Sequence, residues 1–155
     1  MNVSIENMFF KNKGHKERYR RYWGLITDNK YFFHSWLNSP IYVLAAISFS
    51  HQEEIEEHIE ACVIDFKPLL KRSEKWWCDG EIAMVKIAAN NYNDKWKADI
   101  ASSFLNLDMG NRITVIESLK MLYVYKTITE EFSPVIKRYE NLFEGGMVVN
   151  PNCIF

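Results

Sequence analysis

Two histidines and a glutamate lie close together in the stretch HQEEIEEHIEACV, residues 51–63. The spacing of His51, Glu54 and His58 is H-x2-E-x3-H, and Cys62 follows the second histidine by one helical turn. A catalytic zinc site on a helix usually has the order H-E-x-x-H and takes a third ligand from another element. Because that order is absent, these residues are weak metal-ligand candidates, and a small metal-dependent hydrolase is the second alternative function.

Two carboxylates and a thiol also lie close together in the sequence KWWCDGE, which ends at Glu81. Asp79 suits the N-cap of a helix, and Glu81 would lie in its first turn, where a carboxylate interacts favourably with the helix dipole. Cys78 would need a neighbouring base to react. The sequence contains no G-x-S-x-G motif, no P-loop and no Gly-rich dinucleotide loop. These features favour a protein that is not an enzyme, with no catalytic residue and no cofactor.

A basic and aromatic stretch, KNKGHKERYRRYW, covers residues 11–23 and holds six Lys or Arg side chains. On a helix, one flank would carry Lys13, Lys16 and Arg20, and another would carry Arg18 and Arg21. Such clusters can bind phosphates while aromatic rings stack on bases. A nucleic-acid-binding protein that uses residues 11–23 is therefore the first alternative function. The net charge of −1 favours instead a solvent-facing side of a helix or a match to an acidic surface.

Acidic residues gather in the same stretch as the two histidines. If residues 51–63 form an amphipathic helix, one of its sides carries four glutamates: Glu53, Glu56, Glu57 and Glu60. This side could pair with the basic stretch of the same chain, pair with a second copy, or contact the basic groove of a partner. Exposed ion pairs contribute only about 0–1 kcal/mol each, so they steer association more than they stabilise it.

Two adjacent tryptophans, Trp76 and Trp77, are the most conspicuous apolar feature of the chain. Neighbouring residues of one element point in different directions, so both rings cannot enter the same core. One of them should face outward. Because exposed tryptophans often anchor protein interfaces, we expect a partner-binding surface at this position.

The elements that must position these residues are predicted to be helices. Six glycines and four prolines in 155 residues leave few tight turns. In the first helix, His15, Tyr19, Tyr22 and Ile26 form an inward stripe. Ser39 and Pro40 suit a helix start, as an N-cap and first-turn residue. The expected helices cover residues 13–27, 39–49, 51–63, 79–93, 108–126 and 129–144.

The helix over residues 108–126 should bury the apolar side chains Ile113, Ile116, Leu119, Leu122 and Tyr123, and the last helix should begin at Thr129 and end before Gly145. The fold class is therefore mainly all-α, a compact bundle of about six helices in a single domain over residues 1–155. The ambiguous stretches NKYFFHSW and CVIDFKPLL, and the tail MVVNPNCIF, leave room for a small β-hairpin or a C-terminal strand.

Composition indicates a cytoplasmic protein. No apolar run approaches the roughly 18 residues that a membrane span requires, and the first residues lack the pattern of a signal peptide. Three widely spaced cysteines suggest a reducing compartment. The charge is uneven, with +4 over residues 1–50 and −5 over residues 51–110. Opposite charges on neighbouring segments allow an internal match, a homo-oligomer or a partner.

The segments FFKNKGHKERYRRY, SPIYVLAA, RSEKWWCDGEIAMVKIAANNYN and IESLKMLY together resemble a family of small uncharacterised helical proteins, a domain of unknown function from Firmicutes and their phages and mobile elements. The family patterns are F-x-N-x-x-H-x-x-R-[FY] and GE-x-x-[ML]V-x-[LI]A-x-N-[LF][YF]N, and the resemblance covers roughly residues 9–125. It implies a compact helical intracellular protein and no catalytic residue. The residues that match the first pattern, Asn12, His15, Arg18 and Tyr19, are expected to be structural.

Taken together, these features predict a non-enzymatic protein-interaction module. Its contact surface would combine the exposed tryptophan with the four glutamates, and the basic stretch would form a secondary patch. The mobile-element setting of the resembling family suggests a modulator or inhibitor of a host or defence protein. Protein is the expected partner, nucleic acid is a less favoured one, and no membrane contact is expected.

Overall fold

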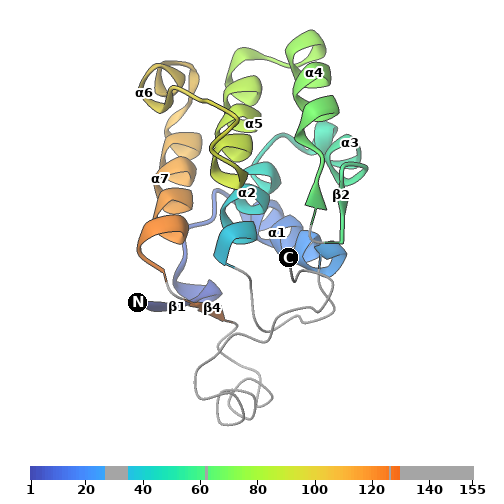
Figure 1. Cartoon of the computed structure of the whole chain (residues 1–155). Helices are drawn as coiled ribbons and strands as arrows, with labels where there is room; N and C mark the ends of the chain where they lie inside the picture. Colours follow the sequence, from blue (N-terminus) through green and yellow to red (C-terminus); the bar gives the residue numbers. More distant parts are fainter. Residues whose placement is uncertain (27–34, 62, 126, 130–155) are drawn as a thin grey trace.

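A buried helix, α2 (Ser35–Ala45), is the element around which the other helices pack. Its neighbours are α1 (Lys13–Ile26), α5 (Asp79–Tyr92) and α7 (Met109–Tyr123). This computed structural model describes residues 1–26, 35–61, 63–125 and 127–129. In Figure 1, α7, α5 and α4 (Phe66–Trp76) stand side by side above α1 and α2.

The remaining helical elements are short. They are α3 (Gln52–Glu56), α6 (Ile100–Ser103) and the 3-10 turns η1 (Ile5–Asn7), η2 (Phe49–His51) and η3 (Phe104–Asn106). The strands form two small sheets. In the first, β1 (Asn2–Ser4) pairs in parallel with β4 (Thr127–Thr129), and Val3 lies opposite Ile128. In the second, β2 (Ile59–Glu60) and β3 (Val63–Ile64) form an antiparallel hairpin.

The mainly helical fold with a small β-hairpin confirms the fold class predicted from the sequence. The inward stripe of the first helix is also confirmed, because His15, Tyr19, Tyr22 and Ile26 are all buried. The helix predicted over residues 79–93 ends as expected, at Tyr92. Within the described residues, no helix is long and apolar enough to cross a membrane.

The amphipathic helix predicted over residues 51–63 is wrong. The helix stops at Glu56, and β2 and β3 follow it, with a positive φ of 40° at Ala61 between them. Glutamates three or four residues apart repel one another on a helix, and Ile59, Val63 and Ile64 favour strands. Ile59 and Ile64 lie opposite each other in the hairpin and are both buried. The hairpin that replaces the expected helix therefore contributes two side chains to the core.

Two predicted helix starts are also wrong. The helix expected to begin at Ser39 begins at Ser35, so Pro40 lies inside α2, and the buried Ser39 hydroxyl accepts a hydrogen bond from Asn91 instead of capping. The N-cap of α5 is Cys78 rather than Asp79, because Glu81 Oε2 accepts a hydrogen bond from the Cys78 backbone N–H at 3.3 Å. Asp79 thus becomes the first residue of the helix, where a carboxylate still favours the dipole.

The prediction of which side of residues 108–126 faces the core is wrong. Ile113, Ile116 and Tyr123 are exposed, whereas α7 buries Thr114, Val115, Glu117, Ser118 and Met121. The buried polar groups have partners. The Tyr125 hydroxyl donates to Glu117 Oε1 at 2.6 Å, and the Ser118 hydroxyl bonds the Val115 carbonyl and accepts from Asn91. A polar face that is fully hydrogen-bonded can occupy the core, which leaves the apolar face outside.

Several predictions fall outside the described residues. These are the helix expected over residues 130–144, the tail MVVNPNCIF and most of the ambiguous stretch NKYFFHSW. Thr129, predicted as the cap of that helix, is the last residue of β4. The other ambiguous stretch, CVIDFKPLL, contains β3 and the start of α4, a helix that the sequence prediction missed.

The carboxyl end of α2 is buried, so its last carbonyl groups need donors from elsewhere in the chain. His15 Nε2 lies 2.8 Å from the Tyr42 carbonyl, and Arg18 Nε donates to the Ala45 carbonyl at 2.8 Å. Lys11 Nζ donates to the Ala46 carbonyl. The buried Gln52 side chain donates to the Leu44 and Ile47 carbonyls. Cations at this end also interact favourably with the helix dipole.

The hydrogen bonds of His15 define its chemical state. Its Nδ1 accepts from the Lys11 backbone N–H at 3.1 Å, so Nε2 carries the proton that bonds the Tyr42 carbonyl. Burial lowers the pKa of His15 to about 3, because a charge in this site would lose its hydration, and the nearby Arg18 and Lys11 act in the same direction. His15 is therefore neutral in the folded protein at neutral pH.

We expect the stability of the protein to fall when the pH falls below about 6.5. The unfolded chain binds a proton at His15 in this range and the folded chain does not, so the free energy of unfolding should drop by about 1.4 kcal/mol per pH unit until the pH approaches 3. Urea denaturation at a series of pH values measures this slope. A His15→Gln variant keeps an N–H donor but cannot titrate, and equal slopes for the two proteins would contradict the assignment.

Candidate functional site

Three large exposed apolar side chains lie on segments that pack near the N-terminal end of α5, and we call them the end patch. They are Phe49, Trp76 and Leu105, with 83%, 67% and 81% of their surface exposed. They come from η2, from the end of α4 and from η3, three segments that all reach the first turn of α5. Because exposed apolar side chains can mark interaction sites, this end of the bundle is a candidate.

One side of the end patch is built around Trp77. This ring is only 8% exposed and stacks on the His51 ring, with centroids 4.1 Å apart and 17° between the planes. His51 Nε2 in turn lies 3.0 Å from Glu81 Oε2. The structure therefore confirms that one tryptophan of the pair faces outward, and it identifies that residue as Trp76. The fixed Trp77 ring holds the backbone from which Trp76 projects.

Glu81 connects α5 to both neighbouring segments. Partial burial alone would raise its pKa, but hydrogen bonds from Ser48 and Cys78 and the proximity of His51 lower the pKa below the usual value. The carboxylate thus stays charged and holds the η2 segment against the first turn of α5. This contact places Phe49, which lies between Ser48 and His51 in the sequence, next to the same helix end.

The other side of the end patch depends on a close backbone approach. A Cβ atom at Gly80 would lie 2.8 Å from the Asn106 carbonyl oxygen, so only glycine allows η3 to pack this closely on α5. Between α4, α5 and η3 lies a pocket of about 320 Å³, whose lining includes Asp79, Ser103 and Asn106. The pocket is open to solvent and adjoins the segments that carry Trp76 and Leu105.

Acidic side chains border the neighbouring hairpin, and we call Glu53, Glu57 and Glu60 the acidic rim. All three are exposed and form no ion pair within the described residues. They line two shallow pockets that also contain Ser50, His58 and Asp65. Glu56, the fourth residue of the predicted acidic face, differs from them, because it pairs with Arg21 at 2.8 Å. The acidic residues therefore lie along α3 and β2 rather than on one helix face.

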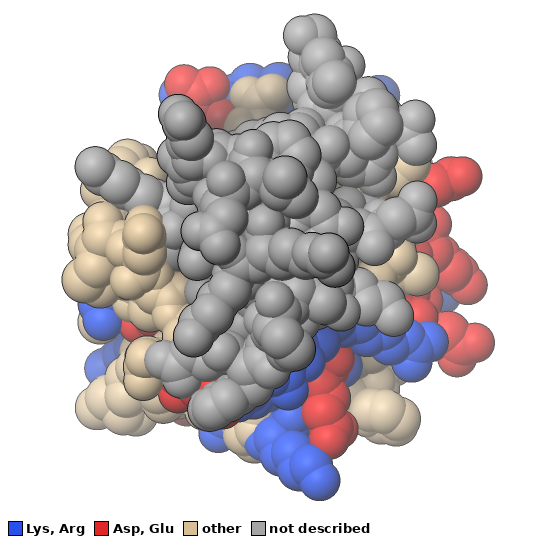
Figure 2. Space-filling model, turned by 90° about the horizontal axis from the view of Figure 1, so that it is seen from below, with Lys and Arg blue, Asp and Glu red and all other residues tan. Residues whose placement is uncertain are grey.

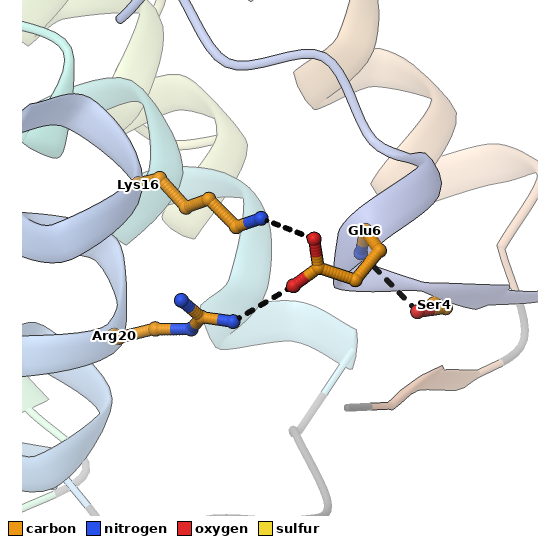
Figure 3. A network of polar contacts seen from close by, with 4 residues as sticks. All are labelled: Ser4, Glu6, Lys16 and Arg20. Atoms are coloured by element: carbon orange, nitrogen blue, oxygen red, sulfur yellow. Dashed lines mark hydrogen bonds and ion pairs between the residues drawn. The ribbon is translucent and has the colours of Figure 1, made fainter. Parts of the chain in front are cut away.

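The cations of the basic stretch are engaged within the chain. Lys16 Nζ and Arg20 Nη2 reach the two carboxylate oxygens of Glu6 at 2.7 and 3.0 Å, as Figure 3 shows. The Ser4 hydroxyl accepts a hydrogen bond from the Glu6 backbone N–H and so fixes the turn that carries this carboxylate. The two cations lower the pKa of Glu6, with the Lys16 hydrogen bond as the largest cause.

The remaining basic residues of this stretch have similar roles. Lys13 pairs with Glu17 at 3.6 Å on the exposed side of α1, Arg21 pairs with Glu56, and Arg18 bonds the end of α2. Figure 2 shows Lys and Arg side chains directly beside Asp and Glu side chains on the face seen from below. The internal match to acidic residues that the charge distribution allowed is thus present, and these cations are not gathered in a free basic patch.

The weak metal-ligand candidates each have other contacts or positions. His51 contacts Trp77 and Glu81, Glu54 pairs with Arg72, and His58 lies at the turn into the hairpin. Cys62 is outside the described residues. Among the residues that the structure does describe, no group of three or more His, Cys, Asp or Glu could hold a metal ion. Cys78 is an exposed free thiol at the N-cap of α5.

The residues that carry the first family pattern are structural in this chain. Asn12 Oδ1 accepts from the His15 backbone N–H at 2.8 Å and so caps α1. His15 and Arg18 bond the end of α2, and the Tyr19 hydroxyl donates to Asn38 Oδ1. Asn12 therefore caps α1, and the other three residues serve the contact between α1 and α2.

Comparison with protein-family models, with curated proteins and with solved structures gives no match.

Sequence reasoning missed two members of the end patch, Phe49 and Leu105. Phe49 stands between two serines and was assigned to the end of a buried helix, and Leu105 lies in a stretch without helical periodicity. Neither has a local signal beyond being apolar among polar neighbours. Only the contacts of their segments with α5 bring them beside Trp76.

We expect Gly80→Ala to destabilise the fold by about 1–3 kcal/mol, because the added methyl group must push η3 away from α5. Gly24→Ala is a matched control. A Cβ at Gly24 meets nothing within 4 Å, so this variant should be more stable by about 0.5–1 kcal/mol through its helix propensity. Chemical denaturation of both variants measures the difference. A Gly80→Ala protein as stable as Gly24→Ala would show that the close approach is absent.

Proposed function

We propose that this protein is a non-enzymatic protein-interaction module that binds its partner through the end patch and the acidic rim. The observation that supports this proposal best is that Phe49, Trp76 and Leu105 are largely exposed and lie on three segments that pack near the start of α5. Burying an apolar side chain of this size stabilises a protein by about 1.5–3 kcal/mol, and the three exposed side chains do not gain this free energy within the chain. A partner that covers them recovers this free energy.

Trp76 is the anchor of the proposed interface. Tryptophan is among the residues that most often dominate binding energy, and its rigid ring loses little conformational entropy on binding. Lys75 Nζ lies 5.0 Å from the centre of the Trp76 ring and so orients it at the end of α4. Trp77, the other predicted contact residue, contributes by fixing this backbone rather than by touching the partner.

The charges around the end patch indicate the chemistry of the partner. Glu53, Glu57 and Glu60 are free of ion pairs in the described chain, and so is Asp79 in the pocket beside Trp76. A partner with an apolar centre and surrounding Lys or Arg side chains would complement this surface. The charges would mainly raise the association rate and reject wrong partners, while the apolar centre would supply affinity.

The same observations weaken the two alternatives. Nucleic-acid binding through residues 11–23 would have to break the ion pairs that Lys16, Arg20 and Arg21 form with Glu6 and Glu56. A metal-dependent hydrolase would need His51, Glu54 and His58 to meet, whereas Glu54 and His58 line one shallow pocket and His51 contacts Trp77 and Glu81 instead. The family resemblance extends the proposal to a host or defence protein as the partner, within the cytoplasm.

An affinity capture from host lysate, with and without nuclease, tests this function. We expect the wild-type protein to capture a stoichiometric partner protein whose binding is unaffected by nuclease. The Tyr123→Ala control should still capture this partner. Trp76→Ala should lose it, with binding of the partner at least about tenfold weaker. Tyr123 is a suitable control because it is an aromatic residue on the outward face of α7 that is even more exposed than Trp76. Charge reversal at Glu53 and Glu57 should mainly slow association.

Three results would contradict the proposal. Capture that is unaffected by Trp76→Ala would show that Trp76 does not anchor the interface. Capture that is lost with Tyr123→Ala but not with Trp76→Ala would move the interface to α7. Loss of every partner after nuclease treatment would favour the nucleic-acid alternative.

A further inference from the structure

Five lysines line a groove on the side of the bundle, away from the first turn of α5. The groove lies between α4, α5 and the loop that follows α5, and its volume is about 530 Å³. This volume lies within the range of small-molecule binding sites, about 300–1,000 Å³. Its lining residues are Lys67, Leu70, Lys71, Glu74, Lys86, Ala89, Lys95, Trp96 and Lys97. We call it the lysine groove.

The charge of the lysine groove is strongly one-sided. The only carboxylate in its lining is Glu74, which pairs with Lys86 at 3.1 Å. Lys67, Lys71 and Lys97 are exposed and form no ion pair within the described residues. They differ in this respect from Lys16, Arg20 and Arg21 of the basic stretch, which are all paired. Several cations that form no ion pair within the described residues therefore line one concave site.

The floor of the lysine groove is apolar and includes a flat aromatic ring. Leu70, Ala89 and Trp96 line it, and Leu70 and Trp96 are partly buried against the core. Lys95 Nζ lies 5.4 Å from the centre of the Trp96 ring. An apolar floor with an aromatic ring and a charged edge suits a ligand that has a planar ring at one end and negative charge at the other.

The loop that closes the lysine groove is held in place. Asn90 Nδ2 donates to the Trp96 carbonyl at 2.9 Å, and the Trp96 backbone N–H donates to the Asn93 carbonyl at 3.0 Å. Asn93 Oδ1 also accepts from the Lys95 backbone N–H. These bonds hold the backbone at Lys95 and Trp96 in place before any ligand arrives, which lowers the entropic cost of binding.

We propose that the lysine groove binds a small phosphate-bearing ligand with a planar ring, of the nucleoside phosphate class. All the cations of the groove are lysines and none is an arginine. Lysine is a compact point charge with three donors, so several lysines together can contact the oxygens of a phosphate chain. The phosphates would lie among Lys67, Lys71 and Lys97, and the ring would pack on Trp96 and Leu70.

Isothermal titration calorimetry with three probes tests this site. ADP carries both parts of the ligand, pyrophosphate carries only the charge, and adenosine carries only the ring. We expect ADP to bind more tightly than either fragment. A Lys71→Gln/Lys97→Gln double variant should bind ADP at least about tenfold more weakly, because two contacts to a charged group are lost. Trp96→Leu should reduce the preference for ADP over pyrophosphate.

Lys75→Gln is the matched control, because Lys75 lies on the same helix but contacts Trp76 outside the groove. It should leave ADP binding unchanged, and all variants should keep the wild-type circular dichroism spectrum. The proposal would be overturned if ADP binding at millimolar concentration were absent, or were equally weakened by Lys75→Gln. Tighter binding of pyrophosphate than of ADP would exclude a role for the ring. Binding of an oligonucleotide but of none of the three probes would replace the small ligand with a nucleic-acid strand.

The proposals for the lysine groove and for the end patch can be tested independently of each other. Trp76→Ala should leave ADP binding intact, and the Lys71→Gln/Lys97→Gln variant should still capture the protein partner.

Discussion

The structure depends on the carboxyl end of α2, which is buried and cannot use water to satisfy its last carbonyl groups. Side chains from α1, from the segment before it and from α3 supply the donors: Lys11, His15, Arg18 and Gln52. Each buried carbonyl left without a partner would cost about 1–3 kcal/mol, so these contacts limit how α1 and α3 can lie. The hydroxyl of Tyr22 on α1 donates to Gln52 and so joins the two sets of donors.

This constraint also explains the distribution of charge. The basic stretch contributes Lys11 and Arg18 to the end of α2, and Lys16, Arg20 and Arg21 to Glu6 and Glu56. Its cations are thus used to hold the first part of the chain together. The unpaired charges lie elsewhere, with carboxylates in the acidic rim and ammonium groups in the lysine groove. The two proposed binding sites use these unpaired charges and the exposed apolar side chains, and neither disturbs the contacts around α2.

The sequence predicted those features whose cause is local. The stripe of α1 follows from the helical period, and the outward tryptophan follows from the geometry of adjacent residues. The orientation of α7 could not be predicted, because burial of Ser118 depends on Asn91 of another helix. The hairpin after Glu56 is stabilised by the pairing of Ile59 with Ile64, whose burial depends on the rest of the fold. The lysine groove was missed for the same reason, since its residues come from three segments and form no motif.

The most direct test of this account is a nuclear magnetic resonance measurement of the His15 ring nitrogens between pH 5 and 8, a range that brackets the ordinary histidine pKa of about 6.5. The account predicts a neutral ring that carries its proton on Nε2 and does not titrate, because burial keeps the pKa near the value of about 3 while the ring bonds the Tyr42 carbonyl. A His15 ring that titrates near the ordinary value, or that carries its proton on Nδ1, would contradict the central contact between α1 and α2.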